Sequence, residues 1–78
     1  MLFRSLQVLG QRIREARKAK GLSLEDLALE SNTALSYIGG VERGQRNPSF
    51  RKMCAIAQTL GRDLGSLCRG LPWPDERV

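Results

Sequence analysis

Histidine is absent from this 78-residue sequence, and cysteine and aromatic residues are scarce. The two cysteines, Cys54 and Cys68, cannot supply the four ligands of a structural zinc site without histidine. We expect two reduced, half-buried thiols and no metal site, a single bridge between them being the alternative. Aromatic residues make up 5% of the chain, which argues against a β-sandwich or barrel.

Long apolar runs are also missing. No segment approaches the ~20 apolar residues of a membrane span, and the N-terminus has no signal-peptide core. We therefore expect a soluble, cytoplasmic protein with no membrane partner. The length allows one small domain, and the sequence contains no metal constellation, nucleophile–base pair or phosphate-binding glycine loop. These absences predict that the protein is not an enzyme and uses no cofactor or small-molecule effector.

The net charge of +5 is unevenly distributed. The ranges 1–20 and 43–70 each carry +5, whereas 21–42 contains no lysine or arginine and carries −4. The remaining range, 71–78, carries −1. A basic protein of this size binds nucleic acid, binds an anionic membrane, or is merely basic, and net charge alone does not choose among these.

Apolar residues recur at three- and four-residue steps, which predicts short amphipathic helices and an all-α fold. Ser23, Thr33, Ser49 and Asp63 are expected to cap helix N-termini. We expect a five-helix domain over residues 1–70 and a short tail over 71–78, where two prolines exclude a helix. The predicted helices are 5–20, 24–31, 34–42, 50–60 and 64–69.

A helix-turn-helix unit is predicted over about residues 23–42. Ala28 is the small residue where the second and third helices meet, and Asn32 tolerates the positive φ that the turn requires. Leu27 anchors the second helix, while Ile38 and Val41 anchor the third from behind. This geometry leaves the third helix protruding, so that its first residues can enter a major groove.

The range Leu9–Leu67 resembles the lambda-repressor-like, Cro/cI-type (XRE) helix-turn-helix family. The resemblance is carried by Leu9–Arg17, Gly21–Ala28, Ser36–Gly44, Arg46–Ser49 and Leu60–Gly61. Within the family, Tyr37–Asn47 is most similar to the small controller proteins of restriction–modification systems. The resemblance implies a sequence-specific transcriptional regulator that binds a near-palindromic double-stranded DNA operator as a homodimer.

The resemblance also implies that Leu35, Ser36 and Gly40 face base edges. Ser36 can hydrogen-bond a base or a phosphate, whereas Leu35 either touches a thymine methyl or is a surface leucine without a role. Tyr37 either packs inward or directs its hydroxyl to a phosphate. Helical Gly39 and Gly40 permit close approach of DNA or of a partner helix, or have no role.

Two further groups of residues are candidates for phosphate contact. Arg43, Gln45, Arg46 and Asn47 form the polar turn after the third helix, and Arg46 is the foremost candidate, the alternative being a solvated loop arginine. Ser23 and Leu24 begin the second helix, whose backbone N–H groups can bind a phosphate. The resemblance implies that glutamine usually stands where Leu24 does and contacts DNA; leucine cannot hydrogen-bond, so that contact is either lost here or replaced by a backbone contact.

The resemblance implies a buried salt bridge between Arg17 and Glu42, and a dimer surface at the end of the domain. The expected dimer residues are Leu64, Leu67, Leu71 and Trp73, with Trp73 covering its own subunit or reaching across the dimer. An antitoxin-like module that binds both DNA and a second protein is the alternative function.

Overall fold

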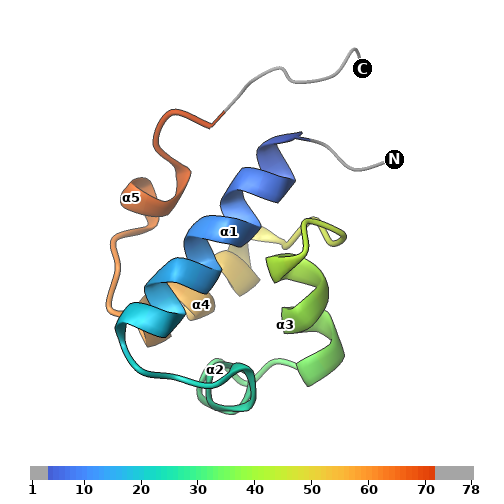
Figure 1. The fold of residues 1–78 in the computed structure, drawn as a ribbon, viewed down its shortest axis with the longest axis vertical. Coiled ribbons are helices and arrows are strands. Elements are labelled where there is room, and N and C mark those ends of the chain that lie inside the picture. The colour runs from blue at the N-terminus through green and yellow to red at the C-terminus, as the bar shows by residue number, and fades with distance from the viewer. Residues whose placement is uncertain (1–3, 72–78) are drawn as a thin grey trace.

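The computed structural model describes residues 4–71, and these form five helices and no strand (Figure 1). The all-α fold class predicted from the sequence is confirmed, and each predicted helix differs from the observed one by at most one residue at either end. The helices are α1 (Arg4–Ala19), α2 (Leu24–Glu30), α3 (Leu35–Glu42), α4 (Phe50–Leu60) and α5 (Leu64–Cys68).

Local hydrogen bonds explain several of the helix ends. The Ser23 hydroxyl accepts from the backbone N–H of Asp26, and the Asp26 carboxylate accepts from the backbone N–H of Ser23, which makes a capping box at α2. Ser49 caps α4 in the expected way, and Gly61 ends that helix in the left-handed conformation. Asn32 adopts a φ of 54°, as the turn between α2 and α3 was predicted to require.

One predicted cap is wrong, and a second has the predicted residue without the expected side-chain hydrogen bond. Ala34, not Thr33, is the N-cap of α3, and no side chain caps that helix. The Thr33 hydroxyl instead donates to the Ser31 carbonyl at 3.1 Å, because a buried hydroxyl needs a hydrogen-bond partner and this carbonyl is close by. Asp63 is the N-cap residue of α5, but its carboxylate makes no capping hydrogen bond.

One hydrophobic core joins all five helices. Ile13, Leu27, Ile38 and Ile56 are fully buried at its centre, and Leu67 of α5 lies in the same cluster. Helices this short are not stable alone in water, so burial of these apolar faces holds them in place. Every buried side-chain polar atom among the described residues has a hydrogen-bond partner.

Gly10 of α1 lies tightly against the end of α3. A Cβ atom at this position would lie 2.4 Å from the Val41 carbonyl oxygen and 2.5 Å from that of Glu42. Because both oxygens belong to the backbone, no side-chain rotation could relieve the clash. Glycine is therefore required for the position that α3 takes against α1.

Helix α1 crosses the centre of the fold, with α3 and α5 on opposite sides of it (Figure 1). Consequently, α3 and the α5 end of the domain lie on different sides of α1. Both cysteines are free and exposed, so the expectation that they are half-buried is wrong. Within residues 4–71, no helix is both long and apolar enough to cross a membrane.

Candidate nucleic-acid interface

An ion pair fixes the end of α3 to α1. Arg17 Nε lies 2.7 Å from Glu42 Oε2, and Nη2 donates to Oε1 at 3.1 Å, so the contact has two prongs. Arg17 Nη1 also donates to the Leu22 carbonyl at 2.9 Å. The two side chains are only 11% and 7% exposed. The hydrogen bond to Glu42 raises the pKa of Arg17, because it stabilises the charged guanidinium.

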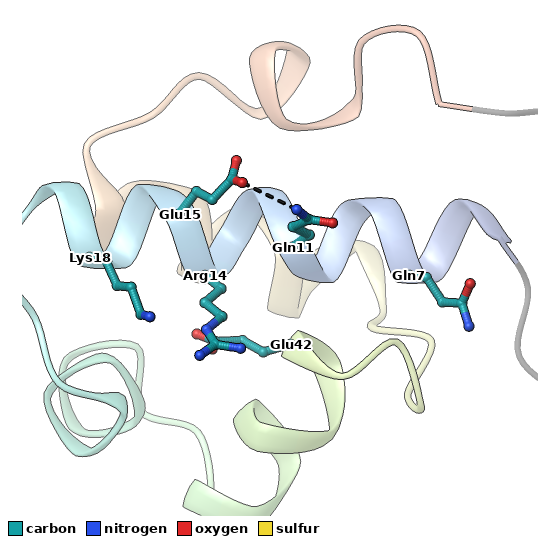
Figure 2. A pocket seen from close by; sticks show the side chains of 6 residues that line it. All are labelled: Gln7, Gln11, Arg14, Glu15, Lys18 and Glu42. Atoms are coloured by element: carbon teal, nitrogen blue, oxygen red, sulfur yellow. Dashed lines mark hydrogen bonds between the residues drawn. The ribbon is translucent and has the colours of Figure 1, made fainter.

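A surface pocket of about 400 Å³ lies beside this ion pair, between α1 and the end of α3. Figure 2 shows Arg14 extending from α1 toward Glu42, while Gln11 donates to Glu15 on the same helix. The charged residues that line the pocket are two cations and two carboxylates. Their charges balance, so the pocket offers no net field that would attract an anionic ligand.

The first turn of α3 presents two of the predicted base-contacting residues to solvent. Ser36 is exposed and Leu35 is 45% exposed, while Ile38 and Val41 on the opposite face are buried in the core. Because α3 is anchored from behind and tied to α1 at its far end, its outward face is held rigidly. Such a rigid, protruding helix is what docking in a major groove requires.

The four predicted loop residues lie together after α3, and all four are exposed. Arg43 Nε donates to Gln45 Oε1 at 2.9 Å, which orients the Arg43 guanidinium. The Arg46 guanidinium lies 5.6 Å from the centre of the Tyr37 ring, within cation–π range. The Tyr37 ring itself is half-buried against the edge of the core. Two cations thus stand next to α3, which carries none.

Gly40 is buried, which conflicts with its predicted position facing a base edge. The space next to its Cα atom is filled by the side chain of Arg46. A base could reach this glycine only if Arg46 moved away, so the prediction that Gly40 faces DNA directly is wrong for this structure.

The start of α2 is less suited to a phosphate than expected. The capping box already uses the backbone N–H groups of Ser23 and Asp26. Hydrogen bonding by Ser23, chiefly through its backbone N–H and then through its side chain, lowers the pKa of Asp26 and so keeps a negative charge at this helix end. Leu24 packs half-buried against the core. A phosphate here would meet a carboxylate, which argues against the predicted contact at Ser23 and Leu24.

The residues predicted for dimer contact divide into three cases. Leu64 and Leu71 are partly buried at the edge of the core. Leu67 is only 3% exposed and belongs to the core of its own chain, so its placement on a dimer surface is wrong. The periodicity that points a leucine inward cannot by itself distinguish a core from an interface. Trp73 lies outside the described residues.

Arg12 is a structural residue that the sequence did not reveal. Its Nη1 donates to the Leu67 carbonyl at 3.0 Å and also to the Arg69 carbonyl. These bonds hold the end of α5 against α1 across more than fifty residues of chain. In the sequence Arg12 is one of six basic residues in the first twenty, and nothing there distinguishes it from a solvated arginine.

Comparison with known proteins identifies relatives of this architecture. A family model described as helix-turn-helix matches residues 13–67. The chain is 35% identical over 61 residues to the HTH-type transcriptional regulator DdrOP3 of Deinococcus deserti, and 41% identical over 54 residues to SinR of Bacillus subtilis. These matches cover 78% and 68% of this chain but 47% and 49% of the relatives, so the chain spans about half their length.

Solved structures with a similar fold come from the same class of proteins. The controller protein C.AhdI from Aeromonas hydrophila superposes with a TM-score of 0.78 at 50% identity, covering 80% of this chain and 94% of that one. SinR in complex with DNA superposes with a TM-score of 0.73 at 37% identity, covering 76% and 95%. These relatives are named as transcriptional regulators or controller proteins, and none of them is named as an enzyme.

Proposed function

This chain belongs to the XRE-type helix-turn-helix family, and on that basis we propose that it is a DNA-binding transcriptional regulator. The observation that carries the proposal is the outward face of α3. Its exposed first turn lies on a rigidly anchored helix, and two exposed arginines stand directly beside it. The related SinR is known in complex with DNA, which supports DNA binding by this chain.

In this proposal the first turn of α3 recognises the DNA sequence, and the arginines of the following loop provide most of the affinity. Leu35 and Ser36 enter the major groove, where Ser36 hydrogen-bonds a base edge or phosphate and Leu35 touches a thymine methyl. Arg43 and Arg46 bind phosphates beside the groove, with Gln45 and Asn47 as polar partners. Since the helix itself offers few polar groups, sequence-dependent DNA shape contributes to the choice of site.

We further propose that the protein binds a near-palindromic operator as a homodimer through the α5 end of the domain. Because α5 lies on the side of α1 away from α3, pairing there leaves both recognition helices free. Half-sites of such a dimer lie about one helical turn of DNA apart. Leu64 and Leu71, which are only partly buried, offer apolar contacts at this end of the domain.

Similarity to C.AhdI over 94% of that protein's length favours a controller-type regulator within this class. An antitoxin-like module remains the second candidate. Co-purification of the natively expressed protein would separate them: a stable complex with a second, toxic protein supports the antitoxin, and recovery of a homodimer alone supports the regulator.

The decisive experiment selects bound sequences from a random DNA pool and then measures the salt dependence of binding. We expect enrichment of an inverted repeat, and affinity that falls steeply as salt rises because released counterions return to the phosphates. Arg46→Ala should reduce the slope of log K against log salt by about one. Arg62→Ala is the matched control, since it removes the same charge from an exposed site between α1 and α5. Enrichment of no sequence would refute a specific regulator, and direct repeats would refute the symmetric dimer.

A further inference from the structure

We infer that Gly40 is a positioning residue that seats the side chain of Arg46 along the recognition helix. The inference rests on the proposed function, in which Arg46 binds phosphate. It gives a role to a glycine that otherwise weakens the middle of a short helix.

The contact between the two residues is unusually close. A Cβ atom built on Gly40 would lie 2.7 Å from Arg46 Cγ, 3.5 Å from Nε and 3.7 Å from Cδ. The nearest of these atoms is at the root of the side chain, not at its mobile tip. An alanine methyl could therefore be accommodated only if the whole Arg46 side chain left its present path.

The other end of Arg46 is held by Tyr37. Tyr37 and Gly40 are three positions apart in α3, so they lie on the same face of the helix. The arginine stem crosses Gly40 and its guanidinium stands over the Tyr37 ring, 5.6 Å from the ring centre. Arg46 consequently runs back along α3 toward the exposed first turn, and carries its charge to a helix that has no cation of its own.

This arrangement pre-organises the cation before DNA binds. A free loop arginine would lose most of its side-chain freedom on binding a phosphate, whereas a seated one has already lost part of it during folding. The contact of Arg46 with Gly40 and Tyr37, called the seat below, thus fixes the position of a loop charge that would otherwise be flexible.

Gly39 provides a matched control next to Gly40. A Cβ atom on Gly39 would lie 3.0 Å from Arg43 Nη1 and 3.6 Å from Leu24 Cδ2. The first of these atoms is the far end of a flexible side chain and can move by a small rotation. Alanine at position 39 should therefore leave its arginine nearly in place, whereas alanine at position 40 should not.

The test compares Gly40→Ala, Gly39→Ala, Arg46→Ala and the double variant Gly40→Ala/Arg46→Ala on a mixed-sequence DNA duplex at low salt. We expect Arg46→Ala to weaken binding about tenfold or more, as loss of a charge-assisted contact does. Gly40→Ala should approach that value, and the double variant should bind no worse than Arg46→Ala alone. Gly39→Ala should stay within about threefold of the wild type. Gly40→Ala binding like the wild type, or effects that multiply in the double variant, would overturn the inference.

A second measurement does not depend on DNA. In the free protein the Tyr37 ring should shift the NMR signals of the Arg46 side-chain protons upfield, and both Gly40→Ala and Tyr37→Leu should abolish this shift. An unchanged shift in Gly40→Ala would refute the seat. Absence of DNA binding by the wild type would refute the proposed function while leaving this test of the seat intact.

Folding of the variants is itself informative. Alanine has a higher helix propensity than glycine, so Gly40→Ala should fold normally once Arg46 has moved. Should Gly40→Ala fail to fold, folding of the double variant would support the contact between Gly40 and Arg46, because it would show that the Arg46 side chain causes the clash. Failure of both variants to fold would overturn the inference.

Discussion

Replacement of Arg17 by alanine should destabilise the protein by about 3 kcal/mol. The substitution removes both prongs of the contact with Glu42 and leaves that carboxylate, 7% exposed, without its partner. It also removes the donor to the Leu22 carbonyl. Breaking a buried ion pair costs about 3–5 kcal/mol, chiefly because one charge is left buried and unpaired. The lower end applies here, since the neighbouring pocket admits water and holds Arg14 near Glu42.

This loss is large for a chain of this length. At about 0.05–0.15 kcal/mol per residue, the total stability of a small domain is on the order of 4–12 kcal/mol. A loss of 3 kcal/mol should lower the thermal midpoint by on the order of 15 °C. Chemical denaturation followed by circular dichroism gives the free energy of unfolding directly.

Two further variants identify the cause of the loss. Arg14→Ala removes a cation from the same pocket and the same helix, but an exposed one, and should change stability by less than about 0.5 kcal/mol. The double variant Arg17→Ala/Glu42→Ala should be more stable than Arg17→Ala alone, because no unpaired charge remains. A change below about 0.5 kcal/mol for Arg17→Ala, or strictly additive effects in the double variant, would refute the reasoning.

Three other predictions concern the fold. Gly10→Ala places a methyl group 2.4 Å from the Val41 carbonyl oxygen. After the gain in helix propensity is subtracted, the substitution should lower the free energy of unfolding by about 2 kcal/mol. Unchanged stability in a denaturant titration would contradict this. The pKa of Asp26 is lowered in the folded state, so wild-type stability should fall as pH drops below about 4. Asp26→Asn should lose less over that range, and equal acid sensitivity would count against the capping box. Leu67→Ala should lower the free energy of unfolding by about 2–5 kcal/mol in a dilute sample, because the side chain lies in the core of its own chain. A variant as stable as the wild type would contradict this core position.

The helix boundaries could be predicted because local chemistry decides them. Ser23, Ser49, Gly61 and Asn32 each act on backbone groups within a few residues, so their effect is visible in a short stretch of sequence. Thr33 shows the limit of such reasoning. It has the right side chain for a cap, but burial directs its hydroxyl to the Ser31 carbonyl instead.

The candidate interface was only partly predictable for a related reason. The sequence indicated that Arg43, Gln45, Arg46 and Asn47 belong together, since they are neighbours in one loop. It gave no sign that Arg46 folds back across Gly40, because that contact depends on the path of the loop. A single amphipathic pattern also placed Leu67 inward without saying whether a partner or its own core would cover it.

The sequence by itself determined that this protein is a small all-α domain with a helix-turn-helix, because the period of its apolar residues and its capping residues act locally. The lack of histidine and the scarcity of cysteine predicted that the protein has no structural zinc site. Only the tertiary structure decided how α3 is held and which cations stand beside it. Those features depend on contacts between residues far apart in the chain: Gly10 with the end of α3, Arg17 with Glu42, and Arg12 with the end of α5.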